Sequence, residues 1–199
     1  MPAWSDLFAA YLKTELSRLD QAGFLQKYGW VEEASRTAKH LLSPANLASM
    51  PAPEIYAAID SIKLPKSQIH MTNLGRVNAA DEVLDGITKL LSQPGDFAQK
   101  YRAGKIPQAG VVTLSQILTL VQPQRFAMRN APFTRALAKQ IPFYTAKALD
   151  ELGYEEYLDL CRELARILES SLKPLGLSQW AVEHRFLLLY AILVAPPEK

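Results

Sequence analysis

Apolar residues recur at spacings of three and four along nearly the whole chain, and this pattern restricts the fold more than any other feature. The spacing is clearest in residues 5–23, 77–91 and 154–176, and no segment alternates apolar and polar residues over the length of a strand. Glycines and prolines separate the periodic segments, as they do at helix ends. The sequence therefore predicts an all-α protein, a compact bundle of about nine or ten helices without an internal repeat.

Capping residues predict several helix boundaries. Gly23 is expected to end the first helix, and Ser178 is expected to begin a C-terminal helix over residues 178–194. Asn130 is expected to cap a helix over residues 131–140, because proline, the second residue of that segment, is favoured in the first helical turn.

The composition is that of an ordinary globular protein. The 199 residues are 49% hydrophobic and 21% charged, and we expect one helical domain over residues 1–199, with a possible subdivision into 1–75 and 76–195. The longest apolar run, residues 186–195, has about half the length of a membrane span, and the N-terminal stretch is charged, unlike a secretion signal. The single cysteine, Cys161, rules out an internal disulfide. A cytoplasmic protein with no membrane partner is expected.

Charge is distributed unevenly along the chain. Residues 97–149 contain no aspartate or glutamate but eight basic residues: Lys100, Arg102, Lys105, Arg125, Arg129, Arg135, Lys139 and Lys147. The flanking segments, residues 1–96 and 150–199, have net charges of −2 and −4. Two interpretations remain open. The acid-free segment forms a positive surface for a polyanion such as DNA, or the acidic C-terminal helices pack beside it and neutralise it.

The residue patterns of common catalytic sites are missing from the sequence. His40, His70 and His184 are far apart and have no metal-ligand spacing, and Cys161 lies on the apolar face of a predicted helix. The chain has neither a phosphate-binding loop nor the glycine motif of dinucleotide-binding proteins. The sequence thus predicts no metal and no cofactor, and it gives no support to an enzyme.

The stretch GKIPQAGVVTLSQIL, residues 104–118, resembles a helix-hairpin-helix element. A helix ending near Gly104, a turn containing Pro107 and Gly110, and a helix beginning around Thr113 carry the resemblance. In that element the turn and the second helix present backbone N–H groups to a phosphate, and glycine permits close approach. The resemblance implies contact with the DNA backbone.

The same stretch is similar to the helix-hairpin-helix DNA glycosylase superfamily, with two departures. Gln108 occupies the first glycine position of the turn. Beyond the second helix, where the superfamily has a catalytic aspartate after a phenylalanine, this chain has Phe126 followed by Arg129 and Asn130. The resemblance therefore implies a related fold without base excision.

A second resemblance is to a helical segment of McrB-like and related restriction-associated proteins, and it covers residues 77–193 at most. It is carried by Gly110, by residues 115–118 (SQIL) and 123–126 (PQRF), and by Asn130. It implies a nucleic-acid-associated helical module, linked to restriction or defence and lacking a GTPase domain, since no phosphate loop is present.

These observations predict a non-catalytic DNA-binding module. The predicted contact residues are Lys105, Gly110, Thr113, Arg125, Arg129, Asn130, Arg135 and Lys139. Several nearby residues have an alternative, purely structural role: Gly110 can cap the turn, and Thr113 or Ser115 can cap the following helix. Phe126 and Phe133 are expected in the core. The rival prediction is a protein-interaction subunit or homo-oligomeric scaffold without a nucleic-acid role.

Overall fold

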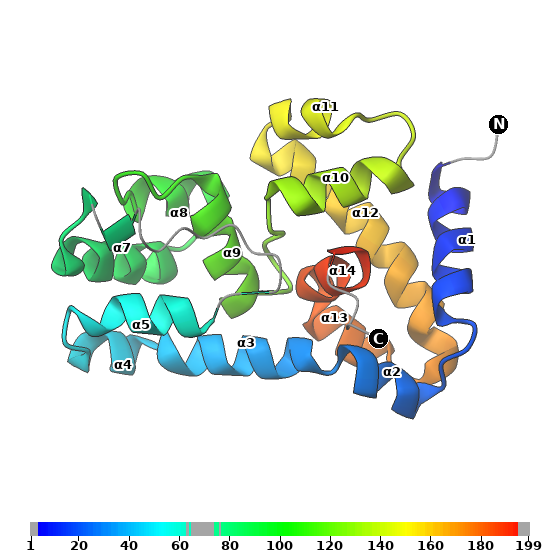
Figure 1. Cartoon of the computed structure of the whole chain (residues 1–199), viewed down its shortest axis with the longest axis horizontal. Helices are drawn as coiled ribbons and strands as arrows, with labels where there is room; N and C mark the ends of the chain where they lie inside the picture. The colour runs from blue at the N-terminus through cyan, green and yellow to red at the C-terminus, as the bar shows by residue number, and fades with distance from the viewer. Residues whose placement is uncertain (1–3, 63, 65–73, 76, 195–199) are drawn as a thin grey trace.

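A computed structural model describes residues 4–62, 64, 74–75 and 77–194 of the chain (Figure 1). The described residues form thirteen α-helices and one short 3-10 helix, and no strand, which confirms the predicted all-α fold. The helices outnumber the nine or ten predicted, because turns divide several periodic segments into shorter helices.

The N-terminal part contains five helices: α1 (Trp4–Leu16), α2 (Gln21–Tyr28), α3 (Trp30–Leu41), α4 (Pro44–Ser49) and α5 (Glu54–Ser61). The prediction that Gly23 ends the first helix is wrong, since Gly23 lies inside α2. Its N–H donates to the Asp20 carboxylate at 2.7 Å, so Asp20 is the N-cap of α2. Aspartate suits this position because its oxygen satisfies an N–H that has no partner within the helix.

The middle part also contains five helices: α7 (Ala80–Ser92), α8 (Phe97–Ala103), α9 (Val111–Val121), α10 (Ala131–Gln140) and α11 (Ala146–Glu151). The predicted helix over residues 131–140 is confirmed as α10, with Asn130 as its N-cap. Helix α9 begins at Val111, two residues earlier than predicted, and its N-cap is Gly110 rather than Thr113 or Ser115.

The C-terminal part consists of α12 (Tyr154–Leu172), the 3-10 helix η1 (Lys173–Leu175), α13 (Ser178–Glu183) and α14 (Arg185–Val194). The single helix predicted over residues 178–194 is broken at His184, and Leu177 rather than Ser178 is the N-cap of α13. The Phe186 N–H donates to the Pro123 carbonyl at 2.9 Å. An N–H in a first helical turn has no partner inside its helix, so α14 can be tied to the α9–α10 loop in this way.

One core joins the two ends of the chain. Helix α12 packs against α1, α13 and α14, while α14 also packs against α10, and α3 packs against α9. Phe133 contacts the rings of Tyr157 and Tyr190 edge-on, with centroids 6.5 and 5.6 Å away. Phe126 and Phe133 are both buried, as predicted. The first helix of the chain thus shares its core with the last ones (Figure 1).

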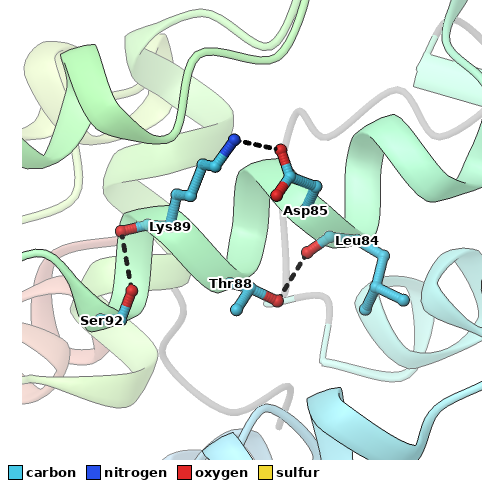
Figure 2. Close-up of polar contacts among 5 residues, drawn as sticks. All are labelled: Leu84, Asp85, Thr88, Lys89 and Ser92. Carbon is cyan, nitrogen blue, oxygen red and sulfur yellow. Dashed lines mark hydrogen bonds and ion pairs between the residues drawn. The ribbon is translucent and has the colours of Figure 1, made fainter.

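Four polar side chains of α7 make contacts that stay within the helix (Figure 2). Lys89 Nζ lies 2.6 Å from the Asp85 carboxylate, and both side chains are more than half exposed. The hydroxyls of Thr88 and Ser92 donate to backbone carbonyls one turn earlier, those of Leu84 and Lys89. An exposed ion pair at this spacing is worth about 0.3–0.5 kcal/mol, so these groups modestly support α7.

Within the part of the chain that the structure describes, no helix combines the length and the apolar character needed to cross a bilayer. Helix α14, which contains residues 186–194 of the longest apolar run, has eight buried residues and packs against α10 and α12.

Candidate nucleic-acid interface

Lys100, one of the eight basic residues of the acid-free segment, is only 2% exposed. Its ammonium group donates to three backbone carbonyls near the end of α7: Leu90 (3.3 Å), Leu91 (3.4 Å) and Gln93. Burial and, second, the charge of Arg125 lower the pKa of Lys100. A cation at a helix C-terminus interacts favourably with the unpaired carbonyls there. Lys100 therefore stabilises α7 and is unavailable to a ligand.

Arg129 has a comparable role at the end of α11. Its Nη2 atom donates to the carbonyl of Leu149 at 3.1 Å and to that of Asp150. The guanidinium group lies 5.3 Å from the centroid of the Tyr157 ring, and the Arg129 N–H donates to the Ser115 hydroxyl at 3.0 Å. These contacts hold the α9–α10 loop against α11 and α12, so Arg129 serves the fold.

Arg125 is exposed but also bound to the backbone. Its Nη2 atom donates to the Gly95 carbonyl at 3.0 Å, and its guanidinium group lies 5.3 Å from the Phe126 ring centroid. Together with Lys100 and Arg129, it explains why some cations of the acid-free segment have no carboxylate near them in the sequence. Carbonyl groups rather than carboxylates bind these three cations, an arrangement that neither interpretation of the charge pattern had predicted.

A cavity of about 400 Å³ beside Arg125 is lined by three arginines: Arg125, Arg162 and Arg185. Arg185 Nε lies 2.5 Å from Glu169, and Arg162 Nη1 lies 2.5 Å from Asp159. Two further carboxylates stand on the wall, those of Asp96 and Glu155. The carboxylates balance the guanidinium charges, so this cavity does not suit a polyanion.

The turn between α8 and α9 contains the predicted residues Lys105 and Gly110, and both are exposed. Gly110 has φ −73°, and a Cβ atom added to it would meet nothing within 4 Å. Gln108 instead has φ 58°, in the left-handed region that favours glycine. Position 108 is therefore the one in this turn at which the backbone conformation favours glycine, and the helix-hairpin-helix turn has its first glycine at the same position. Thr113 is half-buried in the first turn of α9.

Replacing Gln108 with glycine is expected to raise the free energy of unfolding by about 0.5–1 kcal/mol. A left-handed conformation costs a residue with a Cβ roughly 1–2 kcal/mol, part of which the greater chain entropy of glycine offsets. Urea unfolding followed by circular dichroism measures the change. Gly110→Ala is the matched control and is expected to stay within about 0.5 kcal/mol of wild type. Unchanged or lower stability of Q108G would contradict the assignment of strain to this position.

Arg135 and Lys139 occupy the exposed face of α10. They are four residues apart, so their side chains project from the same side of the helix. Among the described residues neither forms an ion pair. Across the connection, Lys147 in α11 lies 3.7 Å from Glu151, and these two side chains are 85% and 67% exposed. Such an exposed pair is weak and leaves the lysine accessible.

Phe143 lies at the turn between α10 and α11 and is 66% exposed. The Tyr144 N–H donates to the Ile141 carbonyl at 3.0 Å, which closes a tight turn with Pro142 and Phe143 at its centre. Ile141 is fully buried, and the Thr145 hydroxyl caps α11. The turn is therefore anchored on both sides while the ring projects outward.

We call the exposed residues around this connection the hairpin tip: Arg135, Lys139, Phe143 and Lys147. The sequence-based site included the first two and missed the others. Pro142 is the one signal in the sequence that could have placed a turn here, because proline favours the second position of a turn.

The predicted site residues do not form one surface. Figure 1 shows α8 and α9 on the left of α10 and the α10–α11 connection on its right, so Lys105 and Gly110 lie apart from the hairpin tip. Asn130 is 2% exposed, and its side chain accepts a hydrogen bond from the Phe133 N–H at 2.9 Å. Asn130 is therefore buried and not accessible to a ligand.

Metal-ligating side chains do not gather in the described part of the chain: no group of three histidine, cysteine, aspartate or glutamate residues comes together there. His40 is exposed and His184 is buried, whereas His70 lies outside the described residues. Cys161 is a buried thiol, as its position on the apolar helix face predicted, and burial raises its pKa to about 12.

The fold and the hairpin tip define a helical protein that presents an exposed cationic and aromatic hairpin. No protein-family model, curated protein or solved structure matches this chain. The resemblances to helix-hairpin-helix and McrB-like proteins therefore stay predictions, and a function has to be argued from the surface itself.

Proposed function

We propose that this protein binds DNA through the phosphate backbone without catalysing a reaction on it, and that the hairpin tip makes the principal contacts. The observation that carries the proposal is the exposed pair Arg135 and Lys139, which has no carboxylate partner among the described residues, next to the exposed ring of Phe143. The restriction-associated role implied by the sequence resemblance belongs to the same proposal.

Charge and spacing support phosphate as the ligand of the hairpin tip. Arginine and lysine one helical turn apart can contact neighbouring phosphates, and the guanidinium fork of Arg135 matches phosphate oxygens. Lys147 adds a third cation whose weak pair with Glu151 is open to exchange. Lys105 and Gly110 lie apart from the hairpin tip and would form a separate contact.

The double variant R135Q/K139Q tests the proposal. We expect wild-type affinity for a fluorescently labelled oligonucleotide to fall steeply between about 50 and 200 mM salt, because bound cations displace counterions from phosphate. The double variant is expected to bind at least about tenfold more weakly at low salt, since two charge-assisted hydrogen bonds are lost. Its salt slope should drop by about 1.4–1.8. Fluorescence anisotropy measures both quantities.

The control variant R36Q/K39Q removes the same charge from exposed positions on α3, which runs along the bottom of Figure 1 while α10 lies above. It is expected to change affinity by less than about twofold. Equal losses in the two double variants would indicate a general charge effect and contradict the hairpin tip. Absence of DNA binding at low salt would overturn the proposal, and salt-insensitive self-association in light scattering would then favour the scaffold.

A further inference from the structure

Building on the proposed function, we infer that the hairpin tip takes single-stranded nucleic acid and that Phe143 stacks on one of its bases. Lys139 and Lys147 lie four residues before and four residues after Phe143, and contact the phosphates on the two sides of that base.

The exposure of Phe143 has no explanation within the fold. Two other large apolar side chains among the described residues are notably exposed, Leu7 at 42% and Val77 at 46%, but Phe143 is the aromatic one and the most exposed. The ring pairs of the described part join other residues, as in Phe97 with Tyr154 at 3.7 Å and Phe24 with Trp180 at 5.9 Å. The Phe143 side chain, 66% exposed, is therefore accessible to a ligand.

The backbone that carries the Phe143 ring is held in place by the contacts of the turn. Pro142 fixes its own φ angle, and the hydrogen bond from Tyr144 to Ile141 closes the turn around Phe143. Thr145 then starts α11 by accepting a hydrogen bond from the Ala148 N–H at 3.1 Å. A ring on a fixed backbone loses little conformational freedom when it binds, which favours affinity.

The combination of a ring and flanking cations distinguishes single strands from duplexes. In a duplex each base face is covered by the next base pair, so an aromatic side chain on a short turn has no face to stack on without unstacking the helix. In a single strand the bases are free, and sites for such strands combine aromatic side chains with a cationic track for the backbone. The hairpin tip has both elements.

The experiment compares two substitutions of Phe143 on labelled single-stranded DNA and on a duplex of the same sequence. We expect the wild-type protein to bind the single strand at least about tenfold more tightly, because one stacked base accounts for such a ratio. Phe143→Leu keeps an apolar side chain without a flat face and is expected to weaken single-strand binding by about tenfold. Its duplex affinity and salt slope should not change. Phe143→Tyr retains the ring and should bind like wild type.

The outcomes separate this inference from the proposed function. If R135Q/K139Q weakens binding but F143L does not, or if single strand and duplex bind equally, base stacking is overturned while phosphate binding stands. If wild-type protein binds neither form at low salt, both are overturned. Because Phe143 is exposed, the thermal midpoints of F143L and F143Y should match wild type, which excludes unfolding as the cause of any loss.

Discussion

Replacing Lys100 with alanine is expected to lower the free energy of unfolding by about 3 kcal/mol. The substitution removes the ammonium donor from three carbonyls at the end of α7, one in a buried and two in part-buried hydrogen bonds, and a buried group left without a partner costs about 1–3 kcal/mol. It also removes the packed aliphatic stem of a side chain that is 2% exposed. Urea unfolding followed by circular dichroism measures the loss.

Two further substitutions separate the contributions of Lys100. Lys100→Met keeps an apolar stem and loses the ammonium group, so it is expected to cost about 2 kcal/mol, mostly from the unpaired carbonyls. Lys105→Ala, at an exposed position of the following turn, should stay within about 0.5 kcal/mol of wild type. If K100M were as stable as wild type, the ammonium–carbonyl contacts would contribute no net stability, and this explanation of the buried charge would be wrong.

Asn130→Ala is expected to destabilise the protein by about 2–3 kcal/mol. Its side-chain oxygen is the acceptor for the Phe133 N–H at the start of α10, at 2.9 Å and inside the core. The side chain also hydrogen-bonds Tyr190, a contact that lowers the pKa of that phenol against the larger upward effect of burial. A lost N-cap costs about 1 kcal/mol when solvent can replace it, and a buried N–H without a partner adds to that cost.

Thr145→Ala is the matched control for Asn130, because Thr145 caps α11 by the same kind of bond in an exposed position. We expect a loss of about 1 kcal/mol there. Asn130→Ser retains an oxygen acceptor and should recover part of the stability lost in N130A. Equal losses in N130A and T145A would contradict the view that burial determines the cost of the missing cap.

These two predictions also separate folding from binding among the basic-segment residues. Lys100 and Asn130 are buried, so a variant such as K100M that remains folded should bind the oligonucleotide like wild type. R135Q/K139Q is expected to do the opposite, losing affinity with little change in stability, since both side chains are exposed. The pair of results would establish which cations of residues 97–149 serve the fold.

The candidate site was only partly predictable. Arg135 and Lys139 were expected at the surface, and their spacing on α10 was sufficient to place them on one side of a helix. Arg129 was expected there too, but its partners are the carbonyls of Leu149 and Asp150, twenty residues further along the chain. A sequence pattern can reveal a missing carboxylate partner, but it does not reveal that a distant helix end supplies carbonyl groups instead.

By itself, the sequence determined the all-α class, most of the helices and the cap at Asn130, because helical periodicity and capping depend on residues within a few positions of one another. Only the tertiary structure decided which charges are free. Lys100 donates to a carbonyl at the end of α7 and Arg129 to one at the end of α11, whereas Arg135 and Lys139 are exposed. Burial and pairing depend on elements that the core brings together, and the spacing of residues along the sequence does not reveal which elements those are.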